Sequence, residues 1–248
     1  MAKYMLIGGG DIGRGTTTYQ TKEIDQEIVK MTNKESPIFL FIGLASSHSD
    51  SYYDTIKKVY QNLNCQTTYL KKSNLINNPN IVERKIKEAD IIYIGGGDTI
   101  KLLEYLKKYN INNLLKEIIS EDKVIVGISA GAIALSKEGF SDSYILRNES
   151  KNHHFVQGIN FIDISLCPHY DTNSIKKEEL SKELENIDKK VIALSNGTAL
   201  KVDEKIEIIT SIDNKEIYMC YYHNKEYIED ILTNENINEK LAVIKKDF

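Results

Sequence analysis

Two short segments of the chain are apolar at every position, Ile38–Ile42 and Ile91–Ile94. Strands that are apolar on both faces lie inside a parallel sheet whose faces are covered by helices. A third segment, Val124–Ile128, has the same character and precedes an apolar segment with helical spacing. These segments predict an α/β fold, a three-layer α/β/α sandwich with a mostly parallel central sheet.

Strand-like and helix-like segments alternate along the first half of the chain, which is typical of βαβ units. Ile24, Ile28 and Met31, for example, recur at the i, i+4 and i+7 positions of one helix face. The expected strands are 3–7, 38–44, 66–70, 91–94 and 124–128, and the expected helices are 21–32, 52–63, 81–88, 99–107, 111–120 and 130–135.

The second half of the chain has a different pattern. Residues 137–160 are polar and predict a loop region, followed by a strand over 161–166 and a charged helix over 174–185. Later short apolar runs predict an antiparallel C-terminal extension of the sheet, with strands at 191–194, 199–202, 206–210 and 216–222. Because no Gly-, Ser- or Pro-rich linker divides the chain, we expect a single domain over 1–248, with a core of 1–233 and a peripheral tail of 234–248.

Composition excludes several classes of protein. The net charge is −4 and no basic stripe is present, so we expect no nucleic-acid partner. No apolar run reaches the roughly 18 residues of a membrane span, and no signal-peptide pattern opens the chain, which predicts a cytoplasmic protein without membrane contact. Cys65, Cys167 and Cys220 are isolated. We therefore expect reduced thiols, no metal site and no cofactor.

The segment Gly127–Gly131 contains the motif G-x-S-x-G between the strand 124–128 and the helix 130–135. This is the nucleophile elbow, a turn so tight that the residues around Ser129 must be small. The turn exposes the serine hydroxyl, and the helix that follows begins with free N–H groups, including that of Ala130, which can stabilise an oxyanion. The motif predicts that Ser129 is a nucleophile.

Two glycine-rich segments follow strands. Gly8–Gly13 satisfies G-x-G-x-x-G, but no helix begins at Gly13 and the second strand ends without an acidic residue, so a dinucleotide site is not expected. These glycines instead allow a loop to pass close to the sheet edge. The second segment, Gly95–Thr99, predicts a loop whose backbone supplies a second oxyanion donor. Asp98 and Thr99 are candidates for substrate contact or, alternatively, for the N-cap of the next helix.

Of the five histidines, His169 is the best candidate for a general base. It follows the strand 161–166 and Pro168, where a loop at the carboxyl edge of the sheet can reach Ser129. His48, His223 and the pair His153–His154 lack that placement.

Together these segments resemble peptidase family S51, the aspartyl dipeptidase (peptidase E) and cyanophycinase group. The resemblance rests on residues 95–99, 127–132, 141–143, 167–171 and 194–199. It implies a fold similar to class I glutamine amidotransferases, with Ser129 as nucleophile, His169 as base, and Gly96 or Gly97 with Ala130 as the oxyanion hole. The expected activity is that of a serine-type peptidase that cleaves a small peptide, such as an Asp-Xaa dipeptide, through an acyl-enzyme.

One position departs from the family pattern. The third member of the catalytic triad is an acid in these relatives, whereas the aligned position here is Asn196. Asparagine can accept a hydrogen bond from the imidazole but cannot balance its charge. Asp142 and Asp171 are alternative orienting acids. The departure leaves two other functions open, a small-molecule amidase or esterase and a non-catalytic binding homologue.

The substrate carboxylate is expected to pair with Arg14, Arg147 or a lysine near the cleft. The oligomeric state is expected to be monomer or homodimer.

Overall fold

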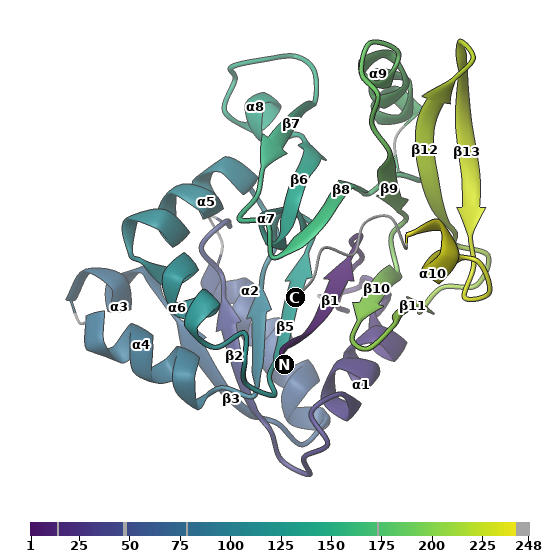
Figure 1. The fold of residues 1–248 in the computed structure, drawn as a ribbon. Coiled ribbons are helices and arrows are strands. Elements are labelled where there is room, and N and C mark those ends of the chain that lie inside the picture. Colours follow the sequence, from purple (N-terminus) through teal and green to yellow (C-terminus); the bar gives the residue numbers. More distant parts are fainter. Residues whose placement is uncertain (14, 47–48, 78, 173, 242–248) are drawn as a thin grey trace.

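The computed structural model describes residues 1–13, 15–46, 49–77, 79–172 and 174–241, and it confirms the α/β fold class (Figure 1). The elements of the first half are β1 (Lys3–Ile7), α1 (Lys22–Lys30), β2 (Ile38–Ile42), α2 (Ser49–Asn62), β3 (Gln66–Leu70), α3 (Lys72–Asn77), α4 (Pro79–Glu88), β4 (Ile91–Ile94), α5 (Thr99–Lys108), α6 (Ile111–Glu117), β5 (Val124–Ile128) and α7 (Ala130–Leu135). Those of the second half are β6 (Ser136–Ser141), α8 (Ser143–Leu146), β7 (His154–Gln157), β8 (Ile162–Pro168), α9 (Ser174–Leu184), β9 (Val191–Leu194), β10 (Thr198–Val202), β11 (Ile206–Thr210), β12 (Ile217–His223), β13 (Glu226–Leu232) and α10 (Ile237–Lys240).

The central sheet has the strand order β11-β10-β1-β5-β4-β2-β3. Strands β1 to β5 pair in parallel, and β10 and β11 extend the sheet with antiparallel pairs. Successive side chains of each parallel strand enter different cores: Phe39 and Phe41 pack toward α1 and α2, whereas Leu40 and Ile42 pack toward α4 to α7. Because both faces are covered, β2, β4 and β5 are apolar throughout, as the sequence predicted.

The second half differs from the expected single extension. Only β10 and β11 join the central sheet, and the other strands form a second, mixed sheet of order β13-β12-β9-β8-β6-β7 (upper part of Figure 1). Its strands β8 and β9 contribute Ile164, Leu166, Ile192 and Leu194 to the core that also contains the helices α4 to α7. The second sheet carries β8 and the loop after it to the carboxyl edge of the central sheet.

The prediction that residues 137–160 form a loop is wrong. They contain most of β6, together with α8 and β7. Glu138 of β6 is only 4% exposed, yet its carboxylate accepts hydrogen bonds from Ser165 (2.7 Å) and Gln157 (2.9 Å) and pairs with Lys189 (2.7 Å). A buried charge is tolerated when it is paired and hydrogen-bonded. Residues of β6 are therefore buried in a strand although their sequence is polar.

Residues 234–241 are not the peripheral segment that their composition suggested. Ile237 and Leu241 are buried in the main core. The amide of Asn238 accepts from the backbone N–H of Ile206 (2.9 Å) and donates to its carbonyl (2.8 Å). Asn234 makes the same pair of contacts with Ile208, so the two side chains cover the open edge of β11. Residues 242–248 lie outside the described part of the chain.

A buried carboxylate joins α1 to α2. Asp25 is 1% exposed and accepts hydrogen bonds from the hydroxyl groups of Tyr19 (2.9 Å), Thr21 (2.7 Å) and Tyr60 (2.7 Å). Burial raises the pKa of Asp25 from 3.8 to about 6, although these three hydrogen bonds oppose the shift. The folded protein therefore holds a proton on Asp25 at pH values where the unfolded chain has lost it.

This shift predicts an unusual pH dependence of stability. Because the folded state binds the extra proton between about pH 4 and 6, the contribution of Asp25 to the free energy of unfolding falls as pH rises through that window. At about 1.4 kcal/mol per pKa unit, the loss is about 3 kcal/mol. Denaturant unfolding of the wild type and of Asp25→Asn from pH 4 to 7 tests this prediction. The free energy of unfolding of the wild type minus that of Asp25→Asn should fall as pH rises through this window. A difference that stays constant with pH would contradict the prediction.

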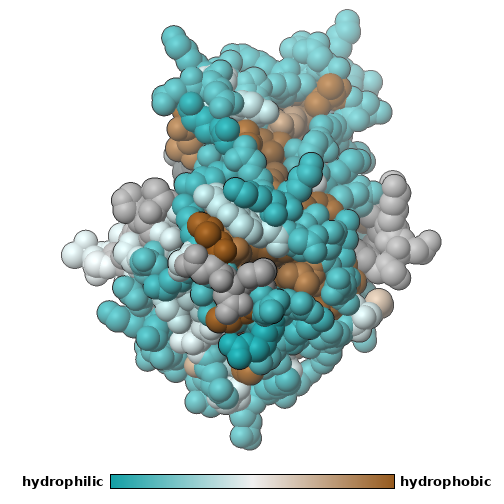
Figure 2. Space-filling view, turned by 90° about the vertical axis from the view of Figure 1, so that its left-hand side faces the viewer, coloured by the Kyte–Doolittle hydropathy of each residue, from teal (hydrophilic) through white to brown (hydrophobic). Residues whose placement is uncertain are grey.

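The outer surface of the helical layer α3 to α6 is mostly hydrophilic, with apolar side chains gathered in its middle part (Figure 2). The exposed large apolar residues of the described chain, such as Ile76 and Leu146, are scattered over different elements. None of the described helices has the length and apolar character needed to cross a membrane.

Candidate active site

Ser129 occupies a strained turn between β5 and α7. Its φ of +54° and ψ of −113° lie outside the regions that residues with a side chain favour, as in a nucleophile elbow. The turn depends on its glycines: a Cβ on Gly127 would lie 2.4 Å from the carbonyl of Gly131, and a Cβ on Gly131 would lie 2.2 Å from the carbonyl of Ile94. The predicted elbow is therefore present, and the side chain of Ser129 is partly accessible.

His169 reaches Ser129 from the loop that follows β8. Its Nε2 is 2.8 Å from Ser129 Oγ, and its Nδ1 is 2.7 Å from Asn196 Oδ1. The backbone N–H of His169 donates to the carbonyl of Gly8 (3.1 Å), which fixes the loop against the end of β1. The structure thus brings together the three side chains predicted as catalytic.

Asn196, in the loop between β9 and β10, holds the place of the third triad member. Asp171, one of the two acids considered for that place, contacts Asn196 instead of the imidazole. Its carboxylate accepts a hydrogen bond from the backbone N–H of Asn196 (2.9 Å) and forms an ion pair with Lys215. Asp142 is exposed at the start of α8 and makes no hydrogen bond to the imidazole. The imidazole is therefore oriented by an amide rather than by a carboxylate.

Gly9 packs against this hydrogen-bonded chain, a contact that the sequence did not reveal. A Cβ on Gly9 would lie 2.2 Å from His169 Cε1 and 2.3 Å from Asn196 Oδ1, and its φ of +149° disfavours any residue with a side chain. Its carbonyl accepts the N–H of Gly197 (2.9 Å). The glycine run from Gly8 was the available signal, because repeated glycines mark a close approach of the backbone.

Gly96 and Ala130 both neighbour Ser129. Ala130 follows it and begins α7, and a Cβ built on Gly96 would lie 3.8 Å from Ser129 Oγ. Among the described residues, the backbone N–H of neither residue donates to a protein acceptor. An oxyanion hole needs unpaired donors near the nucleophile, and this role of Gly96 and Ala130 stays a prediction.

The remaining residues of the segment 95–99 have structural contacts. A Cβ on Gly97 would lie 2.6 Å from the carbonyl of Ala45. Asp98 is the N-cap of α5, where it accepts the N–H of Lys101 (3.2 Å), and Thr99 is 1% exposed, with its hydroxyl 3.0 Å from that of Ser141. Asp98 thus has the N-cap role that was its alternative, and substrate contact by Asp98 or Thr99 stays a prediction.

The electrostatic surroundings keep the imidazole neutral. Burial lowers the pKa of His169, and the nearby ammonium group of Lys176 lowers it further, while the hydrogen bond that His169 donates to Asn196 and the charges of Asp142 and Asp171 oppose the shift. A neutral imidazole is the form that accepts a proton. These surroundings therefore favour the form of His169 that can act as a base over its protonated form.

The space beside the nucleophile is small and polar. A cavity of about 210 Å³ adjoins Gly96 and is also lined by Asp11, Ser46 and Tyr52. Arg147, a predicted partner for a substrate carboxylate, is already engaged with Glu149 (2.9 Å) and Glu104 (3.4 Å) and lies 4.0 Å from Asp98, whereas Arg14 lies outside the described residues. In the described chain, no cluster of His, Cys, Asp and Glu side chains is arranged to hold a metal, and the three cysteines are buried and free.

A comparison with solved structures indicates the class of protein to which this fold belongs. The crystal structure of a peptidase from an acI-B1 actinobacterium matches with a TM-score of 0.69 and 20% sequence identity, and the match covers 94% of each chain. At that level of identity the likeness concerns the fold alone. The fold is thus one that peptidases have.

The sequence comparisons give the family. The pattern of Peptidase family S51 matches residues 4–209. The uncharacterized peptidase YgaJ of Bacillus subtilis is 32% identical over 172 residues, which are 69% of this chain and 70% of that protein. Peptidase E of Shewanella denitrificans is 28% identical over 225 residues, with 86% and 88% of the two chains covered. The chain belongs to peptidase family S51, so it is a peptidase and the predicted resemblance is confirmed.

Proposed function

We propose that the protein is a serine-type peptidase that cleaves small peptides through an acyl-enzyme. The observation that carries this proposal is the chain of two hydrogen bonds from Asn196 through His169 to Ser129. An amide oxygen can only accept, so Asn196 Oδ1 places the imidazole proton on Nδ1. Nε2 is then unprotonated and accepts the proton of the Ser129 hydroxyl.

The proposed reaction has two halves. In the first, Ser129 Oγ attacks the peptide carbonyl carbon while its proton moves to His169 Nε2, and the N–H groups of Gly96 and Ala130 bind the oxyanion. The C–N bond then breaks, and the amine leaves with the proton from Nε2. In the second half, water loses a proton to Nε2 and attacks the acyl carbon, which releases the carboxylic acid and restores Ser129.

An amide in the third position is compatible with this cycle. Cysteine proteases with a Cys-His-Asn arrangement show that asparagine can orient an imidazole. Asn196 does not neutralise the imidazolium that forms during turnover, but Asp171 and Asp142 supply negative charge at longer range. Asp171 also fixes the backbone of Asn196, and this contact helps to hold the amide in place.

Replacing Asn196 by aspartate is expected to move the pH profile. A carboxylate beside Nδ1 stabilises the imidazolium and raises the pKa of His169. Because neutral His169 is the active form, activity is lost as pH falls through this pKa, and the acid limb of kcat/KM should lie at higher pH in Asn196→Asp than in the wild type. The exposed residue Asn224 provides the control variant Asn224→Asp. An acid limb that stays in place would show that residue 196 does not face the imidazole.

The proposed substrate is a small peptide, with an Asp-Xaa dipeptide as the first candidate from the resemblance to aspartyl dipeptidases. A dipeptide library in which half of the members begin with Asp tests this proposal, with simple esters and non-peptide amides as a parallel series. We expect cleavage of dipeptides, with Asp at the first position preferred. Cleavage of esters or non-peptide amides alone would favour a small-molecule hydrolase, and no turnover of any compound would favour a binding homologue.

A further inference from the structure

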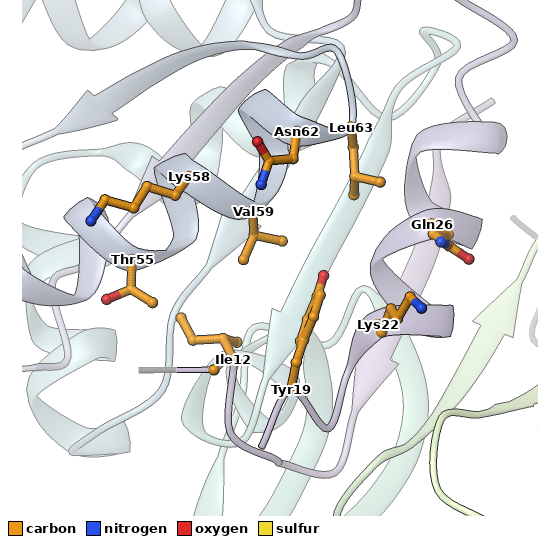
Figure 3. Close-up of a pocket in the computed structure, with 10 residues that line it drawn as sticks. Ile12, Tyr19, Lys22, Gln26, Thr55, Lys58, Val59, Asn62 and Leu63 are labelled. Carbon is orange, nitrogen blue, oxygen red and sulfur yellow. The ribbon is translucent and has the colours of Figure 1, made fainter. Parts of the chain in front are cut away.

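A second cavity lies away from Ser129, between α1 and α2. It has a volume of about 420 Å³, twice that of the cavity beside Gly96, and this volume is in the range of small-molecule sites. Ile12 and Tyr19 form its floor, and Val59 of α2 and Leu63, the residue after α2, add apolar surface (Figure 3). The reaction proposed above makes no use of this space.

The charged residues of this cavity are all basic. Lys22 of α1 and Lys58 of α2 lie on opposite sides of it, and the described residues that line it include no acidic side chain (Figure 3). Among the described residues, neither lysine forms an ion pair. The amides of Gln26 and Asn62 provide neutral hydrogen-bonding groups. An apolar floor with two unpaired ammonium groups complements a ligand that has an apolar body and a carboxylate.

The buried side chain of Asp25 connects the floor of the cavity to both helices. Asp25 binds the hydroxyl of Tyr19, whose ring lines the floor, and the hydroxyl of Tyr60, which belongs to the opposite helix. These hydrogen bonds fix the floor and the spacing of the two helices. A preformed cavity avoids the cost of ordering its walls when a ligand binds.

One loop separates this cavity from the catalytic residues. Ile12 lines both the α1–α2 cavity and the cavity beside Gly96, and it pairs through an isolated bridge with Tyr19. Three residues before Ile12, Gly9 packs against His169 and Asn196. A ligand that contacts Ile12 and Tyr19 therefore contacts the segment whose Gly9 packs against the imidazole of His169.

We propose that the α1–α2 cavity is a regulatory site for a small carboxylate with an apolar body, and that its occupancy changes the reactivity of Ser129 through the segment 8–13. Binding at the cavity is independent of the proposed function, whereas the effect on reactivity rests on Ser129 being the nucleophile.

The binding test uses 4-phenylbutyrate as the probe and 4-phenylbutylamine as its cationic counterpart. Isothermal titration should show saturable binding of the carboxylate and not of the amine. The double variant Lys22→Met/Lys58→Met keeps the apolar stems and should weaken binding about tenfold or more. Lys107→Met/Lys116→Met makes the same charge change on α5 and α6, across the central sheet, and should leave binding unchanged. Absence of saturable carboxylate binding, or equal binding by the two double variants, would overturn the proposal.

Two further measurements complete the test. Val59→Trp fills the cavity without a charge change and should abolish binding of 4-phenylbutyrate; retained binding would place the probe elsewhere and overturn the proposal. Thermal unfolding verifies that each variant is folded. Saturating probe should change the rate at which a fluorophosphonate labels the wild type but not the lysine double variant. An unchanged rate despite binding at the cavity would overturn the regulatory role, and failure of Ser129 to label at all would instead count against the proposed function.

Discussion

Replacing His169 by alanine is expected to lower kcat/KM by about 10⁴-fold, because the variant has no group to take the proton from Ser129. In the structure His169 Nε2 is 2.8 Å from Ser129 Oγ, within the reach that a general base requires. The measurement is steady-state hydrolysis of the best dipeptide found in the library. The fold should survive, since the imidazole is partly accessible.

His223 offers a matched control for this substitution. It is exposed at the end of β12, so His223→Ala removes an imidazole without touching the site. We expect wild-type kinetics for the control. A rate near that of the wild type in His169→Ala would place the base on another residue.

Replacing Gly9 by alanine is expected to reduce kcat/KM by about 10²-fold or more without removing any catalytic group. The added Cβ would lie 2.2 Å from His169 Cε1 and 2.3 Å from Asn196 Oδ1, far inside van der Waals contact. Either the imidazole or the loop must move, and a displacement of about 1 Å at a reacting group can cost two orders of magnitude. The effect should appear in turnover and in the rate of fluorophosphonate labelling.

Gly15 of the same loop separates this clash from simple backbone strain. Its φ of +64° also disfavours alanine, but a Cβ there would meet nothing within 4 Å. Gly15→Ala should therefore lose a modest amount of stability and keep its activity. Equal kinetics for the two alanine variants would contradict the close approach of Gly9 to the catalytic chain.

The parts of the molecule that the sequence predicted depend on local sterics. The strands β2, β4 and β5 are apolar on both faces, which only a covered parallel sheet requires, and the elbow at Ser129 needs small residues at fixed neighbouring positions. Such requirements involve only a few neighbouring residues, so they can be recognised in the sequence. The strand-to-helix turn that presents Ser129 was therefore predictable.

The parts that the sequence did not predict depend on distant partners. The charged residue Glu138 made the sequence of β6 resemble that of a loop. Its burial depends on its partners Ser165 and Lys189, which are distant in sequence. The N-cap role of Asp98 and the burial of Thr99 likewise follow from where α5 meets Ser141. No local pattern encodes such pairings.

The same limit applies to the groups around the catalytic imidazole. The contact of Gly9 with His169, and the hydrogen bond of Asp171 to the backbone of Asn196, join three loops that follow different strands. Their residue types alone do not show which acid orients the base. The structure pairs the imidazole with the amide of Asn196, as the alignment suggested, and places Asp171 behind that amide.

The central claim is that Ser129 is an activated nucleophile, and labelling with a fluorophosphonate probe tests it most directly. The account predicts that the wild type is labelled, that mass spectrometry of the digested protein places the label on Ser129, and that Ser129→Ala takes no label and cleaves no peptide. A folded wild-type protein that stays unlabelled, or a label that persists in Ser129→Ala, would contradict the account.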